Sequence, residues 1–288
     1  MINFEGGVLS LFAILLWILA IIFLAYIMLP VLGIVLRLGL LHQDDLTTAA
    51  VLNPQTMSAM LLSLQTATIS TAICTFMGIP LAYLIARSKS RFTIFIRIAM
   101  TMPLAIPPLI SGALLLNIYG EASPLGMLSE NAGFRLTQSP VGIILAQVFV
   151  ISPFVVLTAS AGIERVDKHY EYASRILGRN AALTFFSVTI PLASKEIAAG
   201  IILAWIRAIG EFGANVMMAY NPKTISIQLW EYNALGGLKL VIPGVLIVMI
   251  ISFASLAFWF WVIDLGRKRE SRRISRVALG IHYNDDQH

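Results

Sequence analysis

The chain has 288 residues, of which 58% are hydrophobic and only 12% are charged, and its mean hydropathy is +0.84. Because roughly a quarter of the residues in soluble domains are charged, this composition excludes an ordinary soluble protein and predicts a membrane protein. The 20 basic and 15 acidic residues leave a net charge of +5. That excess is typical of the cytoplasmic loops of a membrane protein and is too small to indicate a nucleic-acid partner.

Neither a metal site nor a disulfide framework is expected. The single cysteine, Cys74, lies within an apolar run, and one cysteine can build neither a disulfide within the chain nor a site of several thiolates. We predict that Cys74 is a packing residue. The four histidines lie in predicted loops or in the tail, at His42, His169, His282 and His288.

Long apolar segments follow one another along the chain, and about 20 apolar residues suffice to cross the hydrocarbon core of a bilayer. We predict an all-α, polytopic membrane protein in which residues 1–288 form a single membrane domain. Its first apolar run lacks a basic segment before it and a cleavage site after it, so we expect a retained span rather than a signal peptide. The six predicted spans are residues 8–36, 57–86, 94–119, 140–162, 195–220 and 240–263.

The basic residues indicate the orientation. Fifteen of them lie in the loops after the second and fourth spans and in the tail, and four lie on the other side. Because cytoplasmic loops carry the excess of lysine and arginine, we expect a multi-pass protein of the cytoplasmic (inner) membrane with both termini in the cytoplasm. The basic tail, residues 264–288, is interpreted as a stop-transfer anchor for the last helix or, as the less favoured alternative, as a patch that docks on anionic lipid.

The cytoplasmic loop at residues 163–194 contains two predicted short helices. YEYASRIL places Tyr172, Ile176 and Leu177 at helical spacing with charges between them, and Gly178 follows as a helix terminator. ALTFFSVTI forms a second apolar segment that Pro191 closes. An amphipathic hairpin of this kind must bury its apolar face against lipid headgroups, the ends of the spans or a partner protein.

This loop resembles the EAA signature of the permease subunits of ABC importers, which reads E-A-A, then G, then nine residues, then I-x-L-P. Glu171, Gly178 and Pro191 match the signature, Ala173 supplies an alanine, and the departures are apolar exchanges. The departures are Tyr172, Val188 and Ile190.

The resemblance implies a type I ABC-importer permease fold and a set of partners. These are a second copy of the chain, two ABC ATPase subunits and an extracytoplasmic substrate-binding protein, all assembled in membrane lipid. The short helix ending before Gly178 would be the coupling helix that sits on the ATPase, with Gly178 allowing a sharp turn and Pro191 setting the start of the next span. No cofactor is expected in this chain, because it lacks the phosphate-binding pattern G-x-x-x-x-G-K-[ST]; ATP and Mg²⁺ would be bound by the partner ATPase, and this subunit would not be an enzyme.

Two segments within the spans are similar to the oxyanion branch of this family, the permeases for molybdate, tungstate and sulfate. The first, MPLAIPPLISG, contains Pro107 and Pro108 in the third span. Prolines free backbone groups that lipid cannot satisfy, so the break belongs against protein or a water-filled path, although a kink needed only for packing is an equal alternative. The second, RAIGEFGA, begins at Arg207. With the loop, the resemblance covers about residues 61–254.

Arg207 and Glu211 are predicted to lie on one face of a continuous helix, near the middle of the membrane. An arginine at this depth costs about 2.5–3.5 kcal/mol on insertion scales and is expected to face the interior of the bundle. Arginine four residues before glutamate is the weaker order for a helical pair, so we expect Arg207 to have other partners, for example across a subunit interface. Arg207, Glu211 and Gly213, together with Pro107 and Pro108, are our candidates for the pathway or gate. Two roles stay open for Arg207: attraction of a dianion and, the favoured one, a structural clasp.

Other classes of protein fit less well. An ion-coupled secondary transporter would use buried acidic residues and is often built from two related halves, but we detect no repeat, and the hairpin loop would be unexplained. A membrane enzyme is less favoured because no nucleophile–base or metal constellation falls within the spans. Among substrates the resemblance favours tungstate or molybdate over sulfate or thiosulfate.

Overall fold

The computed structural model describes residues 7–40, 53–237, 241–242, 244–255 and 257. All regular elements in these ranges are helices, which confirms the all-α prediction. Their bounds are α1 (Gly7–Leu40), α3 (Pro54–Arg87), α4 (Arg91–Ala105), α5 (Pro108–Tyr119), α6 (Pro124–Asn131), α7 (Pro140–Arg165), α8 (Lys168–Ile176), α9 (Ala181–Thr184), the π-turn η1 (Phe185–Thr189), α10 (Ile190–Leu192), α11 (Ser194–Ile209), α12 (Gly213–Met218), α13 (Ile225–Gly236) and a further helix at Gly244–Ser255.

Three of these helices contain a stretch that is long and apolar enough to cross a membrane by itself, namely Ala13–Leu36, Pro54–Arg87 and Pro140–Arg165. Two bent pairs bring the number of spans to as many as five within the described ranges. The helix Gly244–Ser255 lies inside the sixth predicted span, 240–263, of which the remainder falls largely outside the described residues. The predicted grouping of all spans into one domain stays a prediction.

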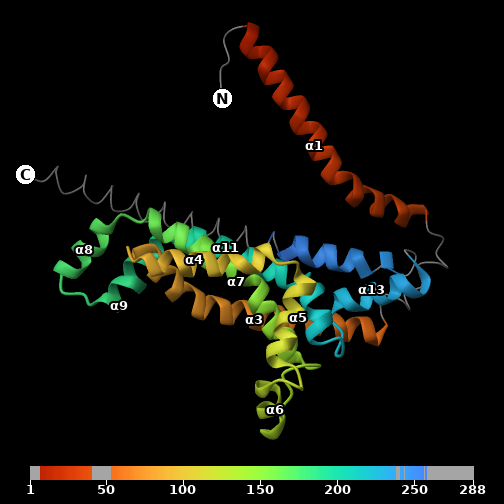
Figure 1. Ribbon diagram of the computed structural model, residues 1–288. Helices are drawn as coiled ribbons and strands as arrows, with labels where there is room; N and C mark the ends of the chain where they lie inside the picture. The colour runs from red at the N-terminus through yellow and green to blue at the C-terminus, as the bar shows by residue number, and fades with distance from the viewer. Residues whose placement is uncertain (1–6, 41–52, 238–240, 243, 256, 258–288) are drawn as a thin grey trace, which may run out of the picture.

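The centre of the fold is a bundle of α3, α7 and α11, with α4 packed on α7 (Figure 1). Its core combines isoleucine side chains with alanines that are completely buried. Small residues let membrane helices approach closely, and Gly200 shows how closely: a Cβ there would lie 2.9 Å from the Phe154 carbonyl oxygen of α7 and 1.9 Å from Thr158 Oγ1. At this point α11 therefore lies close against the backbone of α7.

A buried amide joins the three central helices. Gln147 of α7 is completely buried; its Oε1 accepts a hydrogen bond from Ser70 Oγ at 2.9 Å, and its Nε2 donates to Thr66 Oγ1 at 3.3 Å and to the Ala208 carbonyl at 3.1 Å. Polar groups inside a membrane must find partners within the protein. Gln147 thus connects α3 to the last turn of α11.

The predicted span 94–119 is two helices, α4 and α5, that meet at an angle of 114°. The break falls at Ile106 and Pro107, both with extended backbone, and Pro108 is the first residue of α5. Proline is favoured at a first helical position because its missing N–H would have no partner there. The proline cluster therefore breaks the span rather than bending it slightly.

The predicted span 195–220 is also broken, so the expectation of one continuous helix was wrong. α11 ends at Ile209, and α12 begins only at Gly213. The two short helices after the breaks, α5 and α12, pack against each other. A Cβ on Gly213 would lie 2.8 Å from the Leu109 backbone nitrogen, and one on Gly112 would lie 2.8 Å from the Ala214 carbonyl oxygen. These glycines permit the close contact, and the contact fixes the break.

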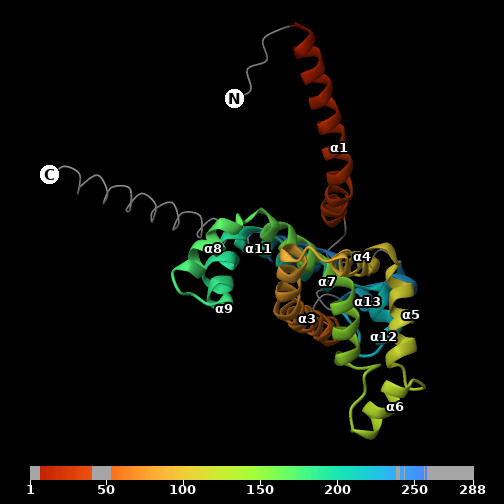
Figure 2. The same cartoon turned by 60° about the vertical axis from the view of Figure 1, so that its left-hand side comes forward.

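Helix α1 lies apart from the other helices in both views of the ribbon (Figures 1 and 2). None of its most apolar stretch, within Ala13–Leu36, is buried in the chain. At the bundle itself, α8 and α9 project from one end, and α13 lies at the opposite end (Figure 1). The two ends of the bundle therefore carry different structures: a helical hairpin at one and the short helices with their connecting loops at the other.

Candidate functional site

The first limb of the hairpin in the loop at residues 163–194 is α8. Its N-cap is Asp167, whose Oδ1 accepts a hydrogen bond from the His169 backbone N–H at 2.9 Å. Hydrogen bonds from the His169 backbone and ring lower the pKa of the Asp167 carboxyl, which keeps the cap charged. The helix ends at Ile176, and Gly178 follows with φ +86°, a left-handed conformation that side chains with a Cβ adopt at a cost. The predicted short helix and its glycine terminator are confirmed.

α8 has two different faces. Glu171 and Ser174, one turn apart, are buried against the rest of the chain. Tyr172, Ile176 and Leu177 point outward, with Ile176 and Leu177 more than 80% exposed. Ala173 is exposed as well. Large apolar side chains left open next to a polar inner face are typical of a surface that another protein covers.

The inner face is held by a buried ion pair. The Nε and Nη2 atoms of Arg87, the last residue of α3, lie 3.0 and 2.8 Å from Glu171 Oε1. The same oxygen accepts a hydrogen bond from Thr189 Oγ1 at 2.8 Å, and Arg87 Nη2 also donates to the Val166 carbonyl at 3.0 Å. One carboxylate oxygen therefore connects α3 to both limbs of the hairpin.

The second limb runs without interruption from Ala181 to Leu192 and contains a π-turn at Phe185–Thr189. Pro191 was predicted to close this segment, and the helix ends one residue later, at Leu192, where the chain bends by 76° into α11. The wider turn, in which Ile190 N–H donates to the Phe185 carbonyl, precedes the proline and accommodates it. Val188 and Ile190 are partly buried, and Ile190 packs against the core of α3 and α7.

The second candidate group lies at the break between α11 and α12. Arg207 Nη1 is 2.6 Å from Glu211 Oε2, in a geometry that makes an ion pair without an aligned hydrogen bond. The Glu211 side chain is completely buried, and that of Arg207 is 33% exposed. Glu211 follows the end of α11, and the non-helical backbone there brings its carboxylate to the arginine; the expected further partner of Arg207 across a subunit interface stays a prediction.

Glu211 also stabilises the start of α12. Its Oε1 accepts a hydrogen bond from the Ala214 backbone N–H at 2.8 Å, and its own carbonyl accepts one from Asn215 Nδ2 at 2.8 Å. A carboxylate at this place satisfies a free N–H of the first turn and interacts favourably with the helix dipole. One side chain therefore neutralises Arg207 and caps the helix after the break.

The structure brings together most of the predicted pathway residues. Pro108 and Gly213 meet where α5 touches α12, and Pro107 directly precedes the contact. Glu211 and Arg207 lie on the same broken segment. Two residues that fix this geometry were missed in the sequence: Gly112, which a search for small residues on the proline helix could have found, and Gln147, the one amide side chain in the predicted span 140–162.

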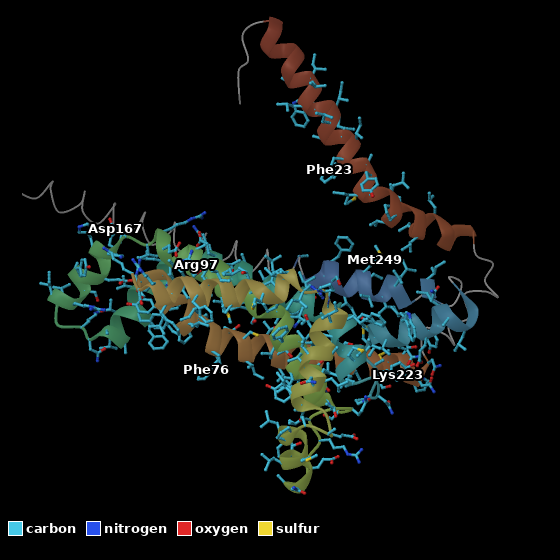
Figure 3. The ribbon with its side chains drawn as sticks, in the orientation of Figure 1. Phe23, Phe76, Arg97, Asp167, Lys223 and Met249 are labelled. Carbon is cyan, nitrogen blue, oxygen red and sulfur yellow. The ribbon has the colours of Figure 1, made fainter. Side chains whose placement is uncertain are left out.

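The opposite end of the bundle carries a polar cluster that the sequence analysis did not identify. Glu231 of α13 accepts hydrogen bonds from Lys223 Nζ, at 2.5 Å, and from the Tyr220 hydroxyl. These two hydrogen bonds lower the pKa of the Glu231 carboxyl, and the bond from Lys223 has the larger effect. Lys223 also lines a pocket of about 630 Å³ with polar side chains of α3. Figure 3 places Lys223 far from Asp167 and Arg97, which lie toward the hairpin.

Residues 78–265 match the family described as "binding-protein-dependent transport system inner membrane component". The chain belongs to this family. As a permease, it is a multi-pass membrane protein and a transport subunit rather than an enzyme. The match includes the hairpin and the broken segments, and it covers most of the region in which the sequence resemblance was found.

Similar curated proteins are permeases as well. The chain is 39% identical over 212 residues to a probable molybdenum ABC transporter permease of Haloferax volcanii, an alignment that covers 74% of this chain and 76% of the relative. It is 37% identical over 205 residues to the molybdate/tungstate transport system permease WtpB of Pyrococcus furiosus, covering 71% and 77%. A probable sulfate transport system permease of Chlorokybus atmophyticus is 31% identical over 219 residues, covering 73% and 76%.

Solved structures of ABC importers share the fold. A bacterial alginate ABC transporter in complex with an alginate-bound periplasmic protein aligns with a TM-score of 0.66 at 15% identity, over 88% of this chain and 92% of the compared chain. The methionine transporter MetNI in an inward-facing conformation aligns with a TM-score of 0.60 at 11% identity, over 72% and 94%. Both confirm the predicted permease fold.

Proposed function

We propose that this permease moves molybdate or tungstate across the cytoplasmic membrane as part of an ATP-driven importer. Its relatives with 39% and 37% identity carry molybdenum and molybdate/tungstate transport in their names, whereas the sulfate permease is more distant at 31%. The segments MPLAIPPLISG and RAIGEFGA support the same assignment by resemblance. Sulfate import is the alternative, because the three ions are tetrahedral dianions of similar size.

The proposed assembly contains two copies of the permease, two ATPase subunits below them and an extracytoplasmic binding protein above. Both termini of the permease would lie in the cytoplasm, on the side of the hairpin. In this arrangement the binding protein selects the anion, and the ATPase supplies the energy. The permease alternates between openings to the two sides by rocking of one subunit against the other.

The observation that carries this proposal is the hairpin of α8 and α9. Ile176 and Leu177, at the end of α8, expose large apolar surfaces where the hairpin projects from one end of the bundle (Figure 1), and Tyr172 is exposed on the same helix. We assign this face as the surface that docks on the ATPase, with α8 as the coupling helix. Gly178 and the bend after Pro191 would set the direction in which the helix pushes on α11.

At the break between α11 and α12 we propose that Arg207 and Glu211 act as a clasp rather than as an anion site. The carboxylate already neutralises the guanidinium at 2.6 Å, so the pair attracts a dianion less strongly than a free arginine would. A pathway that binds its anion tightly would also release it slowly. The contact of Pro108 with Gly213 adjoins the clasp, and the two together would form the gate.

Growth of cells that lack the gene tests the proposal. The cells are grown on limiting molybdate, tungstate and sulfate, and their metal content is measured by mass spectrometry. We expect molybdenum or tungsten to fall and to be restored by the intact gene. A sulfur requirement with unchanged metals would replace the proposed substrate by sulfate, and no change in any of the three would refute the oxyanion assignment.

A further inference from the structure

Arg87 occupies an unusual place for a basic residue in a membrane protein. It is the last residue of the 34-residue helix α3, where a cytoplasmic arginine would ordinarily reach into water. Its side chain is only 12% exposed, and that of its partner Glu171 is 7% exposed. Burial of two charges is costly unless they are paired and further hydrogen-bonded, and both conditions hold here.

The contacts of Arg87 connect three segments that are distant in the sequence. Its guanidinium donates to Glu171 of α8 through two nitrogen atoms and to the Val166 carbonyl, which follows the end of α7. Thr189, on the second limb of the hairpin, shares the same carboxylate oxygen. A second buried contact, Ser174 Oγ to Thr184 Oγ1 at 3.1 Å, joins the two limbs beside it.

Two other arginine–glutamate pairs at the same end of the fold provide a comparison. Arg165 and Glu196 have side chains that are 77% and 32% exposed, and Arg97 and Glu164 have side chains that are 46% and 40% exposed. Exposed pairs of this kind are screened by water and contribute little to keeping two segments in a fixed arrangement. Among these three pairs, only that of Arg87 and Glu171 is buried deeply enough to act as a rigid connection.

At its other end α3 reaches the broken segments. Ser63 Oγ accepts a hydrogen bond from the Ile225 backbone N–H at 2.9 Å, at the start of α13. Ser70 contacts Gln147, which in turn donates to the Ala208 carbonyl next to the break after α11. Helix α3 is thus hydrogen-bonded at one end to the hairpin and is connected farther along, through Gln147 of α7, to the segment that carries Arg207.

We propose that Arg87 is a positioning residue that ties the coupling helix to α3, so that a displacement of α8 is passed through α3 to the break beside Arg207. The inference rests on the proposed function of the hairpin. It also assigns Glu171 to the inner side of the coupling helix: the carboxylate holds the hairpin to the permease, and Tyr172, Ile176 and Leu177 meet the ATPase.

The test uses the complete transporter in lipid vesicles, with ATP hydrolysis and oxyanion uptake measured in the same preparation. Arg87→Gln and Glu171→Gln are compared singly and together. The matched control is Arg165→Gln, which removes an arginine from an exposed pair at the same end. Co-purification of the ATPase reports docking separately.

We expect each single variant to retain the ATPase and to lower uptake per ATP by about 2- to 30-fold, the range for residues that couple two sites. The double variant should be no worse than the worse single one, because both changes break one interaction. Arg87→Lys, which keeps the charge with fewer donors, should lie between Arg87→Gln and the wild type. The control should match the wild type.

Several outcomes would overturn the inference. If the effects of the two single variants multiply in the double variant, Glu171 acts on something other than Arg87. If Arg87→Gln transports normally while Glu171→Gln loses the ATPase, the carboxylate contacts the partner. If Arg165→Gln fails as strongly as Arg87→Gln, the loss is one of general electrostatics. A wild-type complex without ATP-dependent uptake would instead refute the proposed function, which separates the two failures.

Discussion

Arg207 and Glu211 form an ion pair of 2.6 Å across the end of α11, with the carboxylate completely buried and the guanidinium one-third exposed. The two residues are four apart in sequence, yet they do not share a helix, because α11 ends between them. The pair therefore stabilises a break. Because the two side chains are buried to different extents, we expect that removing one partner destabilises the protein more than removing the other, and mutations can measure this difference.

Arg207→Gln should destabilise the permease more than Glu211→Gln. The first change leaves a completely buried carboxylate without its counter-charge, at a cost of about 3 kcal/mol, whereas the second leaves an arginine that is less deeply buried in the chain and keeps an amide oxygen to cap Ala214. The free energy of unfolding is measured by denaturant titration in mixed micelles. Equal stability of Arg207→Gln and the wild type would show that the pair is not formed.

Gly112→Ala should loosen the contact between α5 and α12. An added Cβ would lie 2.8 Å from the Ala214 carbonyl oxygen and 2.9 Å from the Ala214 Cα, and overpacking of this kind costs about 1–3 kcal/mol. Gly210→Ala is the matched control, because the nearest atom to its Cβ, the Ile206 carbonyl oxygen, is 3.8 Å away. In thermal unfolding, Gly112→Ala should have a lower midpoint than Gly210→Ala. Equal midpoints for the two variants would argue against the close contact.

Gly178→Asp should uncouple the hairpin from transport. Gly178 has φ +86° with open space around it, so the change introduces backbone strain of about 1–2 kcal/mol and a negative charge next to the exposed face of α8. ATP hydrolysis should persist while uptake falls. Gly178→Asn, which is nearly the same shape and uncharged, separates strain from charge. Normal uptake by Gly178→Asp with the ATPase docked would contradict the assigned role.

Glu231 should contribute stability that depends on pH. Its pKa in the folded protein lies below the ordinary value of 4.5 because Lys223 and Tyr220 donate to the carboxylate. A lowered pKa means that the contribution is fully present above the unfolded value and is lost as pH falls through the folded one. The difference in thermal midpoint between the wild type and Glu231→Gln should therefore be larger at pH 7 than below pH 4.5. A difference in thermal midpoint that does not change with pH would contradict the lowered pKa of Glu231.

The short helix α8 was predictable because its signals are local. Tyr172, Ile176 and Leu177 repeat at helical spacing, and Gly178 supplies the conformation that ends a helix. The all-α membrane fold followed from apolar length in the same way. Pro107 and Pro108 likewise indicated the break in the third span, where two prolines are adjacent; the single prolines Pro80 and Pro153 lie within the continuous helices α3 and α7.

The break in the fifth span was not predictable by the same reasoning. Within the segment RAIGEFGA only the glycines suggest a break in the helix, and glycine is common inside membrane helices. The break depends on two tertiary contacts, because Gly213 lets α12 touch α5 and Gln147 binds the Ala208 carbonyl, and on one local contact, the capping of α12 by Glu211. The pairing of Arg87 with Glu171 also joins residues 84 positions apart, which no local pattern reveals.

The most direct test of the account is uptake into lipid vesicles that contain the permease with its ATPase, supplied with the binding protein. Labelled molybdate and tungstate are added outside, with ATP inside or absent, and excess sulfate serves as the competitor. The account predicts accumulation of molybdate or tungstate that requires ATP and persists in sulfate. Absence of ATP-dependent accumulation of either ion, or its complete suppression by sulfate, would contradict it.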